Sequence, residues 1–100
     1  MKKILLAVVL LILFGSYVSY AQQGVKWETG TFEQSLKKAQ KANKMIFMDC
    51  YTSWCAPCKW MSENVFPTKE AGEYFNKNFI CVRFDMEKGE GPDLKTRYGV

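Results

Sequence analysis

A nearly continuous apolar run in the middle of the chain, Met45–Tyr51 (MIFMDCY), restricts the possible folds more than any other feature. A strand with one exposed face alternates apolar and polar residues, whereas this run contains a single acid, Asp49. Such a run is typical of a strand that is buried on both faces, as in a parallel sheet covered by helices. We therefore expect a central strand here, with helices packed against the sheet.

The segments on either side of this run alternate between helical and strand patterns. Thr31 and Gln34 have the spacing of a capping box, which predicts the start of a helix. Pro67 separates two further predicted helices. The expected order is strand, helix, strand, helix, helix, strand and helix, in residues 24–30, 31–44, 45–51, 54–66, 69–78, 79–86 and 94–98. This order indicates the α/β class, an α/β sandwich with parallel central strands.

Chemical reactivity is concentrated in residues 54–59 (WCAPCK), directly after the central strand. Unpaired N–H groups at a helix N-terminus favour an anion, so Cys55 at that position is expected to carry a stabilised thiolate. Cys58, about one turn later, can attack a mixed disulfide on Cys55 and close a ring. Pro57 suits the first helical turn, where its missing N–H is not needed. The pattern predicts a dithiol that exchanges with disulfides.

These residues resemble the thioredoxin superfamily, and in particular its exported bacterial members. The similarity runs from the first predicted helix to the end of the chain, and its most specific part is the Trp-Cys-x-Pro-Cys-Lys motif. It implies a thioredoxin-like α/β sandwich and an exported thiol–disulfide oxidoreductase that acts on protein disulfides. The proline-containing dipeptide implies a reductase rather than an oxidase. A reductase would need an upstream electron donor protein, because no dinucleotide fingerprint is present and no cofactor is expected.

The resemblance also implies roles for single residues. Cys55 would be the attacking nucleophile and Cys58 the resolving thiol. Asp49 would relay a proton to or from Cys58, although it could also be a structural acid at the end of its strand. The residues that would support or face the substrate are Trp54, Ala56, Pro57 and Lys59.

Two further cysteines and one tryptophan are given structural interpretations. Cys50 and Cys81 each lie within an apolar strand pattern, where a free cysteine behaves as a small buried hydrophobe. A second disulfide between neighbouring strands is the alternative, and it requires suitable Cα spacing. Trp60 is interpreted as a core aromatic.

Two other functions are compatible with the same residues. The spacing Cys50-x4-Cys55-x2-Cys58, with Cys81 downstream, matches the plant-type pattern for a [2Fe–2S] cluster, and four cysteines could also bind a structural zinc ion. The apolar surroundings of Cys50 argue against a ligand loop. A thioredoxin-fold binding module without turnover is the third interpretation. The presence of both motif cysteines favours an active dithiol over that interpretation.

The N-terminus has the features of a secretory signal peptide, which we assign to residues 1–21. Lys2 and Lys3 precede an apolar run, Ile4–Phe14, and Ser19-Tyr20-Ala21 places small residues at the −3 and −1 positions of a cleavage site. The remaining residues, 22–100, form the expected thioredoxin-like domain. We expect an exported, periplasmic protein with no membrane contact beyond the signal segment. A secreted or signal-anchored protein is the alternative.

Composition excludes several classes of function. The chain contains no histidine, so it can form neither a Ser-His-Asp triad nor a Cys-His pair. Without Lys2 and Lys3 the net charge falls from +4 to +2, and no nucleic-acid partner is expected.

The resemblance also predicts elements that this sequence does not contain. The thioredoxin fold continues with a cis-proline loop, two strands and a helix, and the sequence ends at Val100, where this continuation would begin. We therefore expect the sequence to be part of a longer chain. The alternative is that a partner or a second copy supplies the missing elements. Without them, one apolar edge of the central strand would be exposed.

Overall fold

The computed structural model describes residues 2–5, which are helical, and residues 23–100. The expected signal peptide and its cleavage site therefore lie outside the described residues, apart from residues 2–5. None of the helices in these two ranges has the length and apolar character that crossing a bilayer requires.

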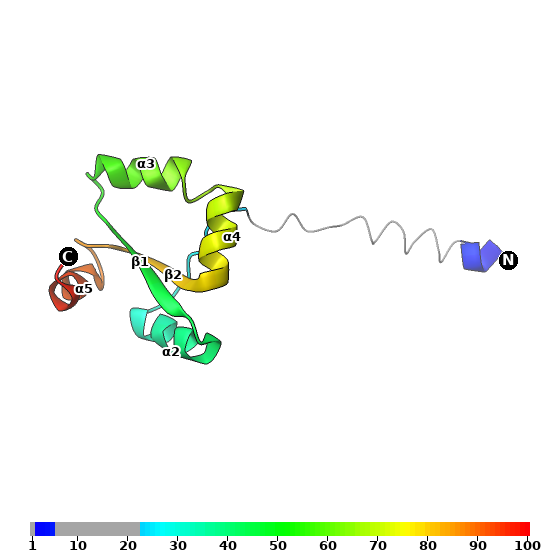
Figure 1. Ribbon diagram of the computed structural model, residues 1–100, viewed down its shortest axis with the longest axis horizontal. Helices are drawn as coiled ribbons and strands as arrows, with labels where there is room; N and C mark the ends of the chain where they lie inside the picture. The colour runs from blue at the N-terminus through cyan, green and yellow to red at the C-terminus, as the bar shows by residue number, and fades with distance from the viewer. Residues whose placement is uncertain (1, 6–22) are drawn as a thin grey trace.

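Residues 23–100 form a domain of four helices and two strands (Figure 1). In chain order they are α2 (Phe32–Ala42), β1 (Met45–Tyr51), α3 (Ala56–Asn64), α4 (Lys69–Asn78), β2 (Phe79–Asp85) and α5 (Gly91–Tyr98). The predicted α/β class and the parallel central strands are confirmed. The first expected strand is reduced to one parallel bridge, between Trp27 and Cys81.

The two strands are parallel neighbours in a two-stranded sheet. Their register places Met45 opposite Phe79 and Tyr51 opposite Asp85. The prediction that β1 is buried on both faces is wrong, because Met45 is 72% exposed and the rest of β1 is half-buried. The physical reason is that, among the described residues, β1 pairs with a strand along only one of its two edges, so its other edge is uncovered. The more deeply buried strand is β2, where Val82 is 1% exposed.

Side chains alternate between the two faces of the sheet, and each face has its own apolar cluster. On the face covered by α3 and α4, Val25, Phe66 and Cys81 are buried and pack with Phe47 and Phe75. On the opposite face, the buried residues are Phe32 of α2, Val82 of β2 and Leu94 of α5. Figure 1 shows α2 on one side of the strands and α3 on the other.

Local hydrogen bonds begin α2 where the sequence predicted. The Thr31 side chain and the Gln34 side chain form the expected capping box at the start of α2. The loop before α5 adds a contact that local sequence does not show, because the Glu90 carboxylate accepts the Phe32 N–H at 3.0 Å. Helix α5 begins at Gly91, before the predicted start at Leu94, since Pro92 suits a first helical turn.

The segment before α2 is fixed against α4 by a close backbone approach. A Cβ atom on Gly72 of α4 would lie 2.5 Å from the carbonyl oxygen of Gly24. The Asn76 amide donates to that same oxygen at 3.0 Å and accepts the Lys26 N–H at 2.8 Å. This contact holds Trp27 beside β2, next to the site described below.

Candidate functional site

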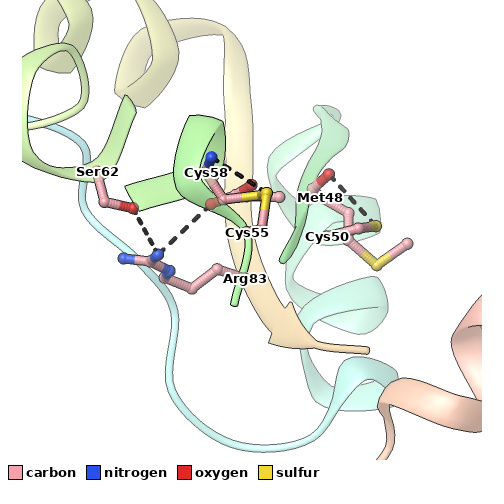
Figure 2. A network of polar contacts seen from close by, with 7 residues as sticks. Met48, Cys50, Cys55, Cys58, Ser62 and Arg83 are labelled. Atoms are coloured by element: carbon pink, nitrogen blue, oxygen red, sulfur yellow. Dashed lines mark hydrogen bonds and ion pairs between the residues drawn. A yellow bond between two sulfur atoms is a disulfide. The ribbon is translucent and has the colours of Figure 1, made fainter. Parts of the chain in front are cut away.

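Cys55 and Cys58 form a disulfide at the N-terminus of α3, where the chain leaves β1 (Figure 2). Their sulfur atoms are 2.10 Å apart and their Cα atoms 5.3 Å apart. Cys55 is the N-cap of the helix, and its Sγ accepts the Cys58 N–H at 3.2 Å. Ala56 and Pro57 form the first turn. The predicted placement of Cys55 at a helix N-terminus is therefore confirmed.

The surface around the disulfide is open. Trp54 is 74% exposed, and its indole Nε1 donates a hydrogen bond to the Glu87 carboxylate in the loop after β2. Lys59 is also exposed. Trp60 is 59% exposed, so its interpretation as a core aromatic is wrong. The next residue, Met61, packs against the core cluster, and neighbouring positions on a helix point about 100° apart.

Asp49 lies on the β1 face that α3 covers, and it is paired with Arg83, which no sequence motif identifies. Its Oδ2 is 3.6 Å from Nη2 of Arg83, which stands opposite it in the strand register. The Asp49 side chain is 15% exposed. Burial raises the pKa of this carboxyl, and the Arg83 charge lowers it in part. Asp49 therefore accepts a proton at a higher pH than an ordinary carboxylate, which a proton relay requires.

Arg83 connects the sheet to the active-site helix. Its Nη2 donates to the Ser62 Oγ of α3 at 2.8 Å. Its guanidinium carbon lies 5.1 Å from the centre of the Trp27 ring and 4.8 Å from that of Tyr51. The sequence signal for this contact was a single basic residue within the apolar strand FICVRFDM.

A pocket of about 240 Å³ adjoins this network. Its lining includes Tyr51 and Arg83 from the strands and Cys58, Lys59, Ser62 and Glu63 from α3. Of the two motif cysteines, Cys58 is the one that faces this space. The pocket therefore lies on the side of the expected resolving thiol.

Cys50 and Cys81 are free and lie apart from each other. Cys81 stands opposite Phe47 in the register and Cys50 opposite Phe84, and the two side chains are on different faces of the sheet. The alternative of a second disulfide between the strands is therefore wrong. Cys81 is 1% exposed, as expected for a buried hydrophobe, whereas Cys50 is half-buried. In Figure 2, Cys50 and Met48 lie on one side of the disulfide and Arg83 and Ser62 on the other.

The free thiols of Cys50 and Cys81 form a thiolate less readily than an ordinary cysteine. Burial raises the pKa of the Cys50 thiol, and the charge of Asp49 raises it further. Burial also raises the pKa of the Cys81 thiol. Within residues 2–5 and 23–100, no three cysteine or acidic side chains gather as metal ligands would. The four cysteines thus do not form the site that the iron–sulfur or zinc interpretation requires.

Comparison with known families agrees with this geometry. The family model Thioredox_DsbH, described as "Protein of unknown function, DUF255", matches residues 15–99. The chain belongs to this thioredoxin-like family. The resemblance inferred from the WCAPCK motif is confirmed.

Individual relatives match part of this chain, and one of them is a thioredoxin. Spermatogenesis-associated protein 20 from Mus musculus is 41% identical over 66 residues, which are 66% of this chain and 8% of that protein. Thioredoxin-1 from Caenorhabditis elegans is 32% identical over 76 residues, which are 76% of this chain and 59% of that protein. The chain thus spans less than two thirds of the length of either relative.

A solved structure confirms the predicted fold. The solution structure of a candidate disulphide-isomerase from Bacteroides thetaiotaomicron is similar to this chain with a TM-score of 0.66 and 42% identity. The match covers 78% of this chain and 64% of that one. The thioredoxin-like fold is therefore established for the described domain.

Proposed function

We propose that this chain is a thiol–disulfide oxidoreductase that exchanges its Cys55–Cys58 pair with protein disulfides. The observation that carries the proposal is the disulfide at the N-terminus of α3, beside an exposed surface. Opening this bond leaves Cys55 at the helix terminus, where backbone N–H groups stabilise a thiolate. Cys58 remains one turn away, within reach of a mixed disulfide.

Reduction of a substrate begins with attack of the Cys55 thiolate on one substrate sulfur. A bond forms between Cys55 and that sulfur, and the other substrate sulfur leaves as a thiolate, which takes a proton from water. The Cys58 thiolate then attacks Cys55 Sγ, so that the Cys55–Cys58 bond forms and the remaining substrate sulfur leaves. The dithiol loses two electrons and the substrate disulfide gains them.

Asp49 is assigned the proton transfer in this cycle. The Cys58 thiol must lose its proton before it attacks, and a carboxylate with a raised pKa is a suitable acceptor. The placement of Asp49 beneath α3 supports this role over a purely structural one. Trp54, Ala56, Pro57 and Lys59 are assigned to the surface that meets the substrate.

The proposal includes export and a net reductive direction. Residues 1–21 have the pattern of a secretory signal, which supports a periplasmic location with protein disulfides as substrates. A reductase in that compartment must itself be reduced by an upstream donor protein. The proline-containing dipeptide supports this direction.

Disulfide isomerisation is the second candidate, and the similarity to a candidate disulphide-isomerase favours it. An isomerase uses the same Cys55 attack, but a substrate thiol resolves the mixed disulfide instead of Cys58. The rate of refolding of a scrambled disulfide protein separates the two activities. A Cys58→Ser variant that still reshuffles bridges would favour isomerisation.

Two substitutions and a titration test the proposal. We expect Cys55→Ser to abolish reduction of a protein disulfide and Cys58→Ser to accumulate a mixed disulfide through Cys55. Free thiols are counted by alkylation and mass spectrometry across a series of redox buffers. Cys55 and Cys58 should titrate together as one couple, near the ~−270 mV of thioredoxin for a reductase. A midpoint near ~−120 mV would contradict the reductive direction, and trapping through Cys58 would contradict the assigned roles.

A further inference from the structure

A polar link joins the active-site helix to the sheet beside Cys58. Ser62 follows Cys58 by four residues on α3, so both side chains lie on the same face of the helix. Arg83 Nη2 donates to Ser62 Oγ at 2.8 Å and lies 3.6 Å from Asp49 Oδ2. One guanidinium nitrogen thus contacts both the helix that carries Cys58 and the acid beneath it.

The surroundings of Arg83 hold this guanidinium in one place. It lies over the Trp27 ring and the Tyr51 ring, at 5.1 and 4.8 Å. A planar guanidinium can stack on aromatic rings and donate in its plane at the same time, whereas a lysine ammonium cannot. The positive charge of Arg83 stands opposite Asp49 in the strand register.

We propose that Arg83 is a positioning residue for the dithiol: together with Ser62 it holds α3 in register over β1, so that a proton can pass between Cys58 and Asp49. This inference rests on the proposed function. In the resolving step, the Cys58 proton moves to the Asp49 carboxylate, which lies on the sheet face that α3 covers. Cys58 Sγ then bonds to Cys55 Sγ, and the substrate thiolate leaves with the electron pair of the broken S–S bond.

Three substitutions separate the positional effect of Arg83 from the effect of its charge. Ser62→Ala removes the tie to α3 and keeps the Arg83 charge. Arg83→Lys keeps the charge and loses the planar fork, and Arg83→Met loses both. The charged or titratable groups placed against Asp49 are Arg83 on β2 and Cys50 on β1. Tyr51, Lys59 and Glu63 line the pocket beside Arg83 and Cys58.

The test uses a symmetric chromophoric aryl disulfide as the substrate of the reduced chain. Stopped-flow absorbance resolves two equivalents of aryl thiolate, the first from Cys55 attack and the second from Cys58 resolution. We expect Ser62→Ala and Arg83→Met to slow the second phase about tenfold and to leave the first within about twofold, because proton transfer depends on placement. Arg83→Met should also move the pH midpoint of the second phase upward, whereas Ser62→Ala and Arg83→Lys should leave that midpoint in place.

The control is Arg97→Met, which breaks a 2.7 Å ion pair with Asp93 on α5 and should change neither phase. Ser62→Ala deletes one hydroxyl, so it keeps the test decisive if Arg83→Met does not fold. An unchanged second phase in Ser62→Ala, or equal slowing of both phases, would overturn the positioning role. A wild-type chain that releases no second equivalent would instead contradict the proposed function.

Discussion

Replacing Gly72 with alanine tests the packing of α4 against the segment that carries Trp27. Glycine inside a helix is normally unfavourable, and Gly→Ala in a helix interior stabilises by up to about 1 kcal/mol. Here the added Cβ would lie 2.5 Å from the Gly24 carbonyl oxygen and 2.7 Å from the Gly24 Cα. Because all of these contacts are with backbone, no side-chain rotation can relieve them. We therefore expect the opposite sign.

The size of the effect follows from the contacts that must change. Real Cβ contacts stay above 3.0 Å, so α4 and the Gly24 segment must separate by about 0.5 Å or more. Overpacking of this kind costs about 1–3 kcal/mol, and loss of the Asn76 hydrogen bond to Gly24 would add about 0.5–1.5 kcal/mol. After the helix gain is subtracted, Gly72→Ala should lower the free energy of unfolding by about 0.5–4.5 kcal/mol.

Urea unfolding followed by circular dichroism measures this change. In thermal unfolding of a domain of this size, a change of 1 kcal/mol in the free energy of unfolding corresponds to a shift in Tm of about 4–8 °C. The matched control is Glu73→Ala, one residue along the same helix, where the side chain is 68% exposed and its ion pair with Lys69 is 3.7 Å long. That change should stay within about 0.5 kcal/mol. Equal or higher stability in Gly72→Ala would refute the close approach of the two backbones.

Two further substitutions test the site acid and the loop before α5. The folded pKa of Asp49 is raised, so the folded state binds its proton more tightly, and stability falls as pH rises from about 3.9 through the folded pKa. Asp49→Asn should therefore be more stable than the wild type at neutral pH but not below about pH 3.9, and it should also slow Cys58 resolution. Identical urea midpoints at neutral pH would contradict the raised pKa. Glu90→Ala removes the acceptor of the Phe32 N–H and should cost about 0.5–2 kcal/mol, with faster amide exchange at Phe32. An unchanged rate of amide exchange at Phe32 would show that the Glu90 carboxylate does not protect the start of α2.

Features that depend on neighbours in the sequence were predicted well. The Thr31–Gln34 capping box and the start of α3 at the Cys55 motif require residues within one turn of each other, so their spacing carries the necessary information. The dithiol is predictable for the same reason, because Cys55 and Cys58 meet through the geometry of a single helical turn.

Features that depend on the register of distant strands were not predicted. Asp49 was selected from its position before the motif, but its partner Arg83 is identified by the pairing of β1 with β2. Trp60 was misplaced because an apolar residue next to a core position can point to either side of a helix. The burial of β1 was overestimated because an apolar pattern does not report how many strands lie beside it.

The separation of the two free cysteines bears on how the chain would fold in an oxidising space. Cys55 and Cys58 close a very short ring, so they can pair early, before any sheet exists. Alignment of the strands places Cys50 and Cys81 on opposite faces, where Cys81 is buried and Cys50 is half-buried. Mispaired bridges to these thiols can therefore arise while the chain is still unfolded. The alignment of β1 with β2 therefore keeps these two thiols apart as well as forming the sheet.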